Sequence, residues 1–204
     1  MFIGGYLQYS KGNWDLNSSL TVGYEDNKTK RTILDNLQGY ETAIANYGSY
    51  YVSPALNLTY NYNITSDIKL HPAIYVSYSY GNYSRYSETG TTNSNLSFAK
   101  TDTGAVNGGI ELAIAKSVSK VTEAEFRIGS RLIKYGDNNV NISFGNNSSS
   151  FSIAGDDKIV SNYAGANISY AIKKNINITA DIEGSKASGN QTAFAGFVGF
   201  KIGF

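Results

Sequence analysis

Cysteine is absent from the 204-residue sequence, which excludes a disulfide framework and a metal site built on thiolates. A single histidine, His71, leaves little material for a histidine metal cluster or a catalytic relay. The formal net charge is only +1, and no basic patch is interleaved with aromatic residues, so we expect no nucleic-acid partner. No apolar run approaches the roughly 18 residues that a transmembrane helix needs.

What the chain does contain favours long strands joined by polar loops. It has 17 tyrosines and 21 glycines against two prolines, and its mean hydropathy is −0.28. A low mean hydropathy is compatible with a membrane β-barrel, because only alternate residues of each barrel strand face lipid. The composition therefore leaves open a membrane protein that spans the bilayer with strands.

Period-two alternation is the strongest pattern in the sequence. In LNLTYNYN at 56–63, every apolar or aromatic residue is followed by a polar one. The pattern recurs over 68–80 and over 176–183. Strict alternation of this kind predicts strands with one apolar and one polar face.

Residues 123–132 narrow the choice of β architecture, because Glu123, Glu125, Arg127 and Arg131 share one strand face. Charges on one face require water or mutual pairing, which a barrel lumen offers and the inside of a β-sandwich does not. The ionisable residues on the polar faces of the predicted strands, which we expect to be lumen-facing, are Asp15, Lys69, His71, Glu111, Glu123, Glu125, Arg127, Arg131, Asp181, Glu183 and Lys201.

We predict an all-β fold, an antiparallel up-and-down transmembrane β-barrel. The predicted strands, about nine in number, are 2–10, 14–25, 49–63, 68–81, 97–116, 120–135, 159–172, 175–187 and 191–204. Short turns alternate with longer loops at 26–48, 82–96 and 136–158, as in outer-membrane barrels with periplasmic turns and external loops. Residues 30–45 are predicted to hold a helical turn or two.

Strand parity predicts that the domain spanning 1–204 is N-terminally incomplete. Bacterial single-chain barrels have an even number of strands, so at least one strand is expected before Met1, and three would also restore parity. Met1 leads directly into FIGGYLQY, without the features of a signal peptide. An outer-membrane protein must first cross the inner membrane, so we expect an N-terminal part of the natural chain to precede Met1.

The order of motifs along the chain resembles the C-terminal translocator β-domain of autotransporters, the type V secretion proteins. The segments that carry the resemblance are GGYLQYSKGNWDLNSSLTVGY followed by Arg31, then SPALNLTYNYNI, LHPAIYVSYSYGNYSRYSETG, NYAGANISYAIKKNINITADIEGS and FAGFVGFKIGF. The resemblance implies a twelve-stranded barrel with a helix in its pore leading to an N-terminal passenger. Residues 1–204 are similar to the last nine of those strands.

The C-terminal strand carries a candidate assembly signal. Val198, Phe200, Ile202 and Phe204 alternate with smaller or polar residues and end the chain on an aromatic side chain. This arrangement resembles the signal read by the outer-membrane barrel assembly machinery, which we therefore expect as a partner. The alternative is an ordinary last strand that happens to end in phenylalanine.

Catalysis is not expected, and neither is a cofactor or a metal. A hydrolytic site around His71 would need a nucleophile and an orienting group in a specific geometry, and no G-x-S-x-G motif occurs. The sequence therefore predicts a protein without an active site.

Three functions remain open. The first is an outer-membrane translocator and anchor of a Gram-negative bacterium, supporting export or surface display of an N-terminal passenger, with the lipid bilayer and the passenger as partners. The second is a general pore or adhesive surface barrel without a passenger, for which 26–48 is the candidate constriction loop. The third, a soluble all-β binding protein, does not explain the charged face of 123–131 or the continuous apolar exterior.

Overall fold

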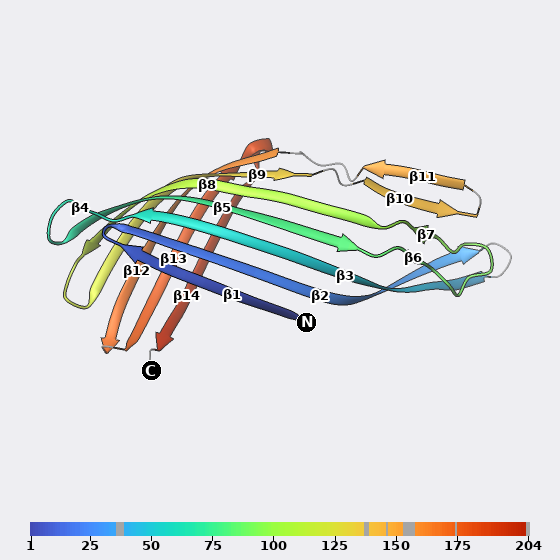
Figure 1. Ribbon diagram of the computed structural model, residues 1–204, viewed down its shortest axis with the longest axis horizontal. Coiled ribbons are helices and arrows are strands. Elements are labelled where there is room, and N and C mark those ends of the chain that lie inside the picture. The colour runs from blue at the N-terminus through green and yellow to red at the C-terminus, as the bar shows by residue number, and fades with distance from the viewer. Residues whose placement is uncertain (36–38, 137–138, 146, 153–157, 174, 203–204) are drawn as a thin grey trace.

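The computed structural model describes residues 1–35, 39–136, 139–145, 147–152, 158–173 and 175–202. Nearly all of these residues are in antiparallel strands, which form one long curled sheet and a smaller second sheet (Figure 1). Among them, no helix is long and apolar enough to cross a membrane. The prediction of an all-β antiparallel fold is confirmed.

The strands of the large sheet lie in chain order, β1-β2-β3-β5-β8-β9-β12-β13-β14, with β4 paired to β5. Their bounds are β1 Phe2–Lys11, β2 Trp14–Asp35, β3 Gly39–Tyr60, β4 Tyr62–Asn63, β5 Ile68–Tyr83, β8 Thr101–Ser117, β9 Thr122–Tyr135, β12 Lys158–Lys173, β13 Ile176–Ala187 and β14 Thr192–Ile202. A short 3₁₀ helix, η1 at Ser188–Asn190, joins β13 to β14. Sequential antiparallel neighbours define the up-and-down topology expected from the sequence.

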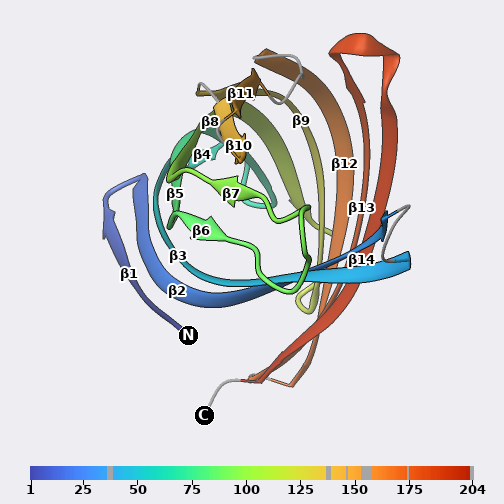
Figure 2. The same cartoon turned by 90° about the vertical axis from the view of Figure 1, so that its right-hand side faces the viewer.

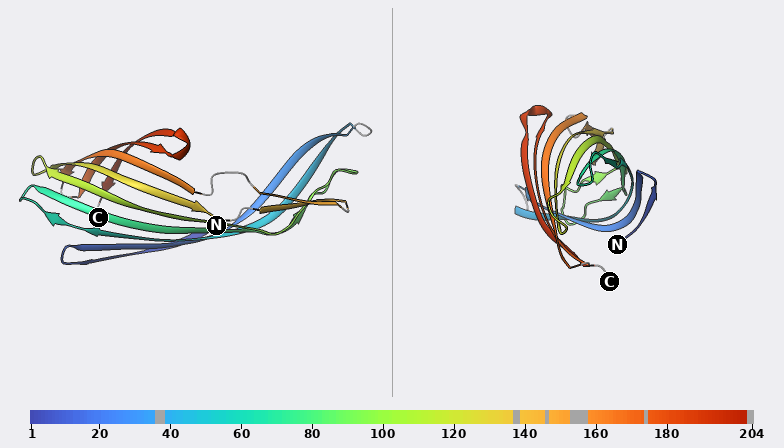
Figure 3. Two further views of the ribbon diagram at one scale, coloured as in Figure 1. Left: turned by 90° about the horizontal axis from the view of Figure 1, so that it is seen from above. Right: turned by 90° about the vertical axis from the view of Figure 1, so that its left-hand side faces the viewer.

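The sheet curls into an open half-barrel (Figures 2 and 3). In the described part of the chain, β1 pairs only with β2, and β14 pairs only with β13. Tight turns such as Lys11–Trp14 gather at one end, which we call the short-turn end. The long connections gather at the other, the hairpin end (Figure 1).

The register places odd-numbered residues from β2 to β14 on one face of the sheet. One row of partners runs from Asp15 through Thr59, Ala73 and Glu111 to Gly129. The apolar side chains that are buried are all odd-numbered, namely Ala43, Ala45, Ala113, Ala115 and Tyr163. Because the side chains on the inside of a curve converge and shield one another, the odd-numbered face is the concave, inner face.

The even-numbered, outer face of the sheet is apolar and exposed. Ile110 is 62% exposed, Ile182 66% and Phe194 86%. Between Asp102 and Lys116 on β8, the outer positions are Gly104, Val106, Gly108, Ile110, Leu112 and Ile114. At about 3.3 Å per residue and a tilt of about 40°, these six positions cover roughly 25 Å, the height of a lipid-facing band.

Aromatic side chains border this apolar band at both ends. Trp14 and Tyr60 pack ring against ring at the short-turn end, with centroids 4.7 Å apart. Tyr50 and Tyr80 form a second pair toward the hairpin end, at 6.2 Å. Rings that combine an apolar body with a polar tip favour the boundary between lipid and water.

Beyond the hairpin end lies a second sheet of order β11-β10-β7-β6. Its strands are β6 Tyr86–Ser87, β7 Ser97–Phe98, β10 Asn139–Phe144 and β11 Asn147–Ser152. The β2–β3 hairpin extends into the same region (Figure 3). An aromatic stack joins them, because Tyr86 lies 4.3 Å from Tyr47 and 4.5 Å from Phe98, measured between ring centroids.

An ion pair fastens the β2–β3 hairpin to the segment that precedes β7. Arg31 on β2 donates two hydrogen bonds to the carboxylate of Glu88, the first from Nε at 3.1 Å, and a third to the carbonyl oxygen of Ser94 at 2.8 Å. The Glu88 side chain is only 4% exposed, and it also accepts from the backbone N–H of Leu96. Arg31, quoted above only as part of the family resemblance, therefore has a structural partner.

We expect this hairpin contact to loosen in acid. The Arg31 guanidinium lowers the pKa of Glu88 below its usual value of 4.5. A carboxyl with a lowered folded-state pKa stabilises the fold fully above 4.5, and this stabilisation is lost as pH falls through the folded-state value. Limited proteolysis between 26 and 48 should accelerate below pH about 4.5. The Glu88→Gln variant should be cleaved faster at neutral pH, with a weaker dependence on pH, and equal acid sensitivity in both proteins would contradict this role.

Three expectations for 26–48 are wrong. The described residues of this segment are strand, not loop, and those of 30–45 show no helical turn. Nor do they form a constriction, because the hairpin continues past the end of the large sheet (Figure 1). The physical reason is that the hairpin is held by contacts with a segment distant in sequence: Ala43 and Ala45 are buried, and Tyr47 stacks on Tyr86. The hairpin therefore needs no continuous apolar face, and its sequence lacks the alternation by which a strand is predicted.

Candidate functional site

The densest polar cluster lies on the inner face and is centred on Arg127 of β9. Its guanidinium forms a bidentate pair with Asp181 of β13, at 2.6 and 2.8 Å, and reaches Glu183 at 3.2 Å. The Arg127 side chain is 14% exposed. Paired, planar hydrogen bonds of this kind fix both partners in geometry as well as in charge.

Arg131, four residues further along the same face of β9, extends the cluster. It forms a second bidentate pair with Glu183, at 2.6 and 2.8 Å, and its guanidinium carbon lies 3.8 Å above the centre of the Tyr163 ring. The Tyr163 hydroxyl donates to Glu111 at 2.7 Å, and Glu111 lies 3.8 Å from Nε of Arg127. Side chains of four strands, β8, β9, β12 and β13, are thereby joined into one network.

Two glycines make these crossings of the sheet possible. Arg127 and Glu183 are the register partners of Gly165 on β12, and a Cβ on Gly165 would lie 3.0 Å from the Arg127 guanidinium. A Cβ on Gly129 would lie 2.3 Å from the Tyr163 hydroxyl. The missing side chains leave the space through which Arg127 reaches β13 and Tyr163 reaches Glu111.

The Gly129→Ala substitution tests this requirement. The added methyl should displace the Tyr163 ring and break its bond to Glu111, destabilising the barrel by about 1–3 kcal/mol. Urea unfolding in lipid vesicles, followed by tryptophan fluorescence, measures the change. Gly5→Ala is the matched control, because its Cβ would meet no atom within 4 Å. Equal stability of the two variants would show that Tyr163 adjusts without loss.

A second, smaller polar chain lies at the short-turn end. Asp15 accepts hydrogen bonds from Ser10 and Asn61, and the Asn61 oxygen lies 2.7 Å from Nδ1 of His71. The imidazole therefore donates to an amide, whereas the Ser10 hydroxyl at the other end of this chain of contacts donates to Asp15 and not to the imidazole. The arrangement ties β1, β2 and β5 to the residue that follows β3, which is a structural role.

Three other predicted lumen residues, Lys69, Glu123 and Glu125, lie on the inner face without joining either cluster. Glu123 and Lys69 are exposed, and Glu125 is half-buried. The register pairs position 201 with Asn177, but the Lys201 side chain lies outside what the structure describes. Glu111, Glu123, Glu125, Asp181 and Glu183 outnumber the two arginines, so the inner face of β8–β13 has an excess of negative charge.

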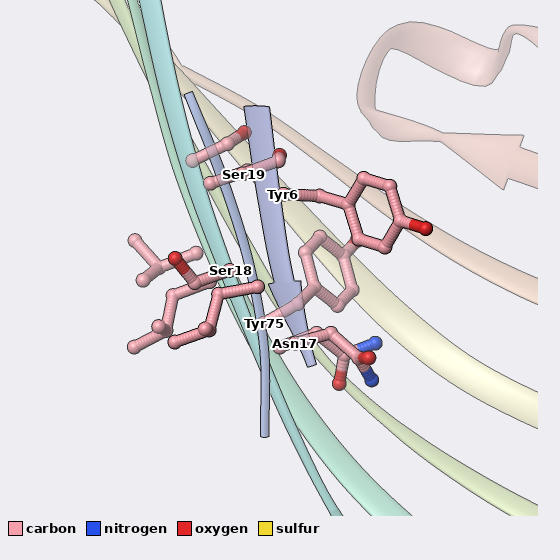
Figure 4. A pocket seen from close by; sticks show the side chains of 11 residues that line it. Tyr6, Asn17, Ser18, Ser19 and Tyr75 are labelled. Atoms are coloured by element: carbon pink, nitrogen blue, oxygen red, sulfur yellow. The ribbon is translucent and has the colours of Figure 1, made fainter. Parts of the chain in front are cut away.

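The other half of the inner face, over β1–β5, is polar but carries few charges. Figure 4 shows the rings of Tyr6 and Tyr75 and the amide of Asn17 on one side of the strands, with Ser18 on the other. These residues line a hollow of about 260 Å³. The concave surface is thus divided between a charged wall and a wall of tyrosine, asparagine and serine.

The predicted assembly signal is described only in part. Val198 and Phe200 are 75% and 76% exposed on the outer face of β14, and the backbone of Ile202 pairs with Ile176. Phe204 lies outside the described residues. The strand therefore presents exposed apolar side chains at Val198 and Phe200.

Sequence reasoning missed the uncharged members of both clusters. Tyr163, Asn61 and Ser10 occupy polar-face positions of their strands, so the alternation that identified the charged residues would have included them. The glycines at 129 and 165 were a further signal of the cluster, because a position without a side chain on a strand face leaves room for a large side chain from a neighbouring strand.

The chemistry available on the inner face is that of ion pairs and hydrogen bonds. Among the described residues, no group of three or more histidine, cysteine, aspartate or glutamate side chains could hold a metal ion. Arg127 and Arg131 are paired with carboxylates, and Tyr163 donates its hydroxyl hydrogen to Glu111. The hydrogen bonds of these groups are therefore made within the cluster.

The chain matches the model of a known protein family. Residues 1–183 match the family model described as the autotransporter beta-domain. No curated protein matches the chain. The matched region runs from β1 to Glu183 on β13, and so includes every residue of the Arg127 cluster.

Proposed function

The chain belongs to the autotransporter β-domain family, and from this premise we propose that it inserts into the outer membrane of a Gram-negative bacterium and supports export or surface display of an N-terminal passenger. The family is one of translocators and anchors rather than enzymes. The proposed partners are the lipid bilayer, the passenger and the barrel assembly machinery.

The observation that carries the proposal is the difference between the two faces of the curled sheet. The outer face is uncharged over roughly 25 Å, and the inner face carries the Arg127 cluster. An exposed apolar face of this extent marks a surface that contacts a membrane or another protein, and its height of roughly 25 Å is that of a lipid-facing band. A charged inner face is stable only where water reaches it or its charges are paired.

Export can be tested directly in cells. In the natural chain, with the N-terminal part that we propose precedes Met1 retained, an epitope is placed ahead of that part, and intact Gram-negative cells are treated with external protease. We expect the epitope to be cleaved, as is a second epitope inserted between β10 and β11. Cleavage of the second epitope alone would show insertion without export, which would contradict the translocator role and favour the pore.

The general-pore alternative receives no support from 26–48, since the described part of that segment continues beyond the sheet instead of forming a constriction. The domain is also proposed to be incomplete at its N-terminal side. This agrees with the unpaired outer edge of β1 in the described sheet.

The assembly signal makes a separate prediction. Phe200→Ser should reduce the amount of folded barrel in the outer membrane several-fold, because it removes an aromatic side chain from the alternating outer-face set that forms the predicted signal on the edge strand. Quantitative blotting of membrane fractions measures this. Phe197→Ser, on the opposite face of β14, is the matched control. Equal assembly of both variants would indicate an ordinary last strand.

A further inference from the structure

A groove of about 430 Å³ lies on the outer face where β9, β12, β13 and β14 run side by side. Its floor is made of small residues, Ala164, Ala166 and Gly184. Large apolar side chains stand around it, namely Phe126, Ile182 and Phe194. The Phe194 ring lies over Gly184, 3.1 Å from where a Cβ would be. The groove is thus an apolar depression in the outer face of the sheet.

Basic side chains lie beyond this groove, toward the hairpin end. Lys186 is two residues from Gly184 on the same face, and its register partner is Asn162. Lys158 lies four positions from Asn162 on β12, or about 13 Å along the strand. Its register partner on β9 is Lys134. All three lysines are exposed. Between the floor and the Lys134–Lys158 pair lie two rows of outer-face partners, Asn162 with Ser130 and Val160 with Leu132. Thr192 is the register partner of Lys186.

The Lys134–Lys158 pair points to an anionic ligand. Like charges directly opposite each other in a sheet destabilise it. Among the described residues of β9, β12 and β13, no carboxylate occupies an outer-face position. An anion between the lysines would relieve this repulsion, and the groove beneath would hold an apolar chain attached to that anion.

We propose that this face binds a phosphorylated, multiply acylated glycolipid of the outer leaflet, with an acyl chain in the groove and a phosphate at Lys134 and Lys158. The inference rests on the proposed outer-membrane placement. The hairpin end is then the external side, where such a lipid resides. Basic residues at the edge of an apolar surface are the recognised means of binding anionic lipids.

The test uses the full chain in phosphatidylcholine vesicles that contain diphosphoryl lipid A, followed by detergent extraction and native mass spectrometry. We expect one lipid A molecule retained per chain, with weaker retention of the monophosphoryl form. Lys134→Gln with Lys158→Gln should weaken retention roughly ten- to thirty-fold. Gly184→Leu, which fills the groove without changing charge, should also weaken it.

Lys116→Gln with Lys120→Gln is the matched control, because it removes two lysines at the short-turn end. Equal loss in this control, or undiminished retention in both the lysine and the Gly184 variants, would overturn the site. Membrane insertion is measured separately, as protection from protease in vesicles of phosphatidylcholine alone. Failure there would contradict the proposed function itself, whereas insertion without lipid A retention would contradict only the groove.

Discussion

The Arg127→Ala variant is expected to lose about 3 kcal/mol of unfolding free energy, because removing one partner of a partly buried ion pair leaves charge without compensation. Asp181 loses its bidentate partner and Glu183 keeps only Arg131, and these two side chains are 24% and 16% exposed. The loss should lie toward the lower end of the range for buried pairs, since the inner face is in contact with water. Urea unfolding in vesicles measures it.

The matched control is Lys69→Ala, which removes a cation from an exposed position of the same face and should change stability by less than about 0.5 kcal/mol. A double-mutant cycle with Asp181→Ala isolates the pair. A coupling energy near zero would show that the two side chains are solvated independently, and the cluster would then have no structural role.

Ile110→Arg is expected to reduce the stability of the membrane-inserted barrel by about 2–4 kcal/mol, the effect of an arginine placed near the bilayer midplane. Ile110 is 62% exposed at the centre of the outer face of β8, between Ile74 on β5 and Ser130 on β9. The same measurement applies, and in cells the variant should accumulate as unfolded protein in the periplasm.

Ser19→Arg controls for the arginine itself. Ser19 is exposed on the inner face of β2, where a cation can be hydrated. We expect it to insert as well as the unsubstituted protein. If Ser19→Arg and Ile110→Arg were equally impaired, the assignment of the two faces to water and lipid would be wrong.

The Arg127 and Ile110 experiments test the two faces of the sheet, the charged inner face and the apolar outer face. The Arg127 cluster links β8, β9, β12 and β13, and it includes Tyr163, the largest of the buried apolar side chains. With few other large side chains buried, ion pairs and hydrogen bonds take the place of an apolar core on this wall. A rigid charged wall would keep the lumen open and wet, as the proposed export of an unfolded passenger requires.

The sequence by itself determined the part of the large sheet that alternates, which leaves out the outer halves of β2 and β3. Residues 68–81 were predicted as strand and β5 is Ile68–Tyr83; residues 120–135 were predicted and β9 is Thr122–Tyr135. The physical reason is that each of these strands separates lipid from water. This requirement imposes alternation on every strand that crosses the membrane, and alternation is a local property of the sequence. The same two-residue alternation also predicts that the charged residues lie on the inner face, because they occupy the polar positions of their strands.

Only the tertiary structure decided the fold of 26–48 and the partners within the clusters. Both faces of that hairpin are polar over much of its length, so it has no alternation, and its order depends on Tyr86 and Glu88 from a distant segment. The pairing of Arg127 with Asp181 likewise depends on register and on the curvature of the sheet. Alternation specifies which face a side chain occupies, whereas contact with a partner 54 residues away is set by how three strands align.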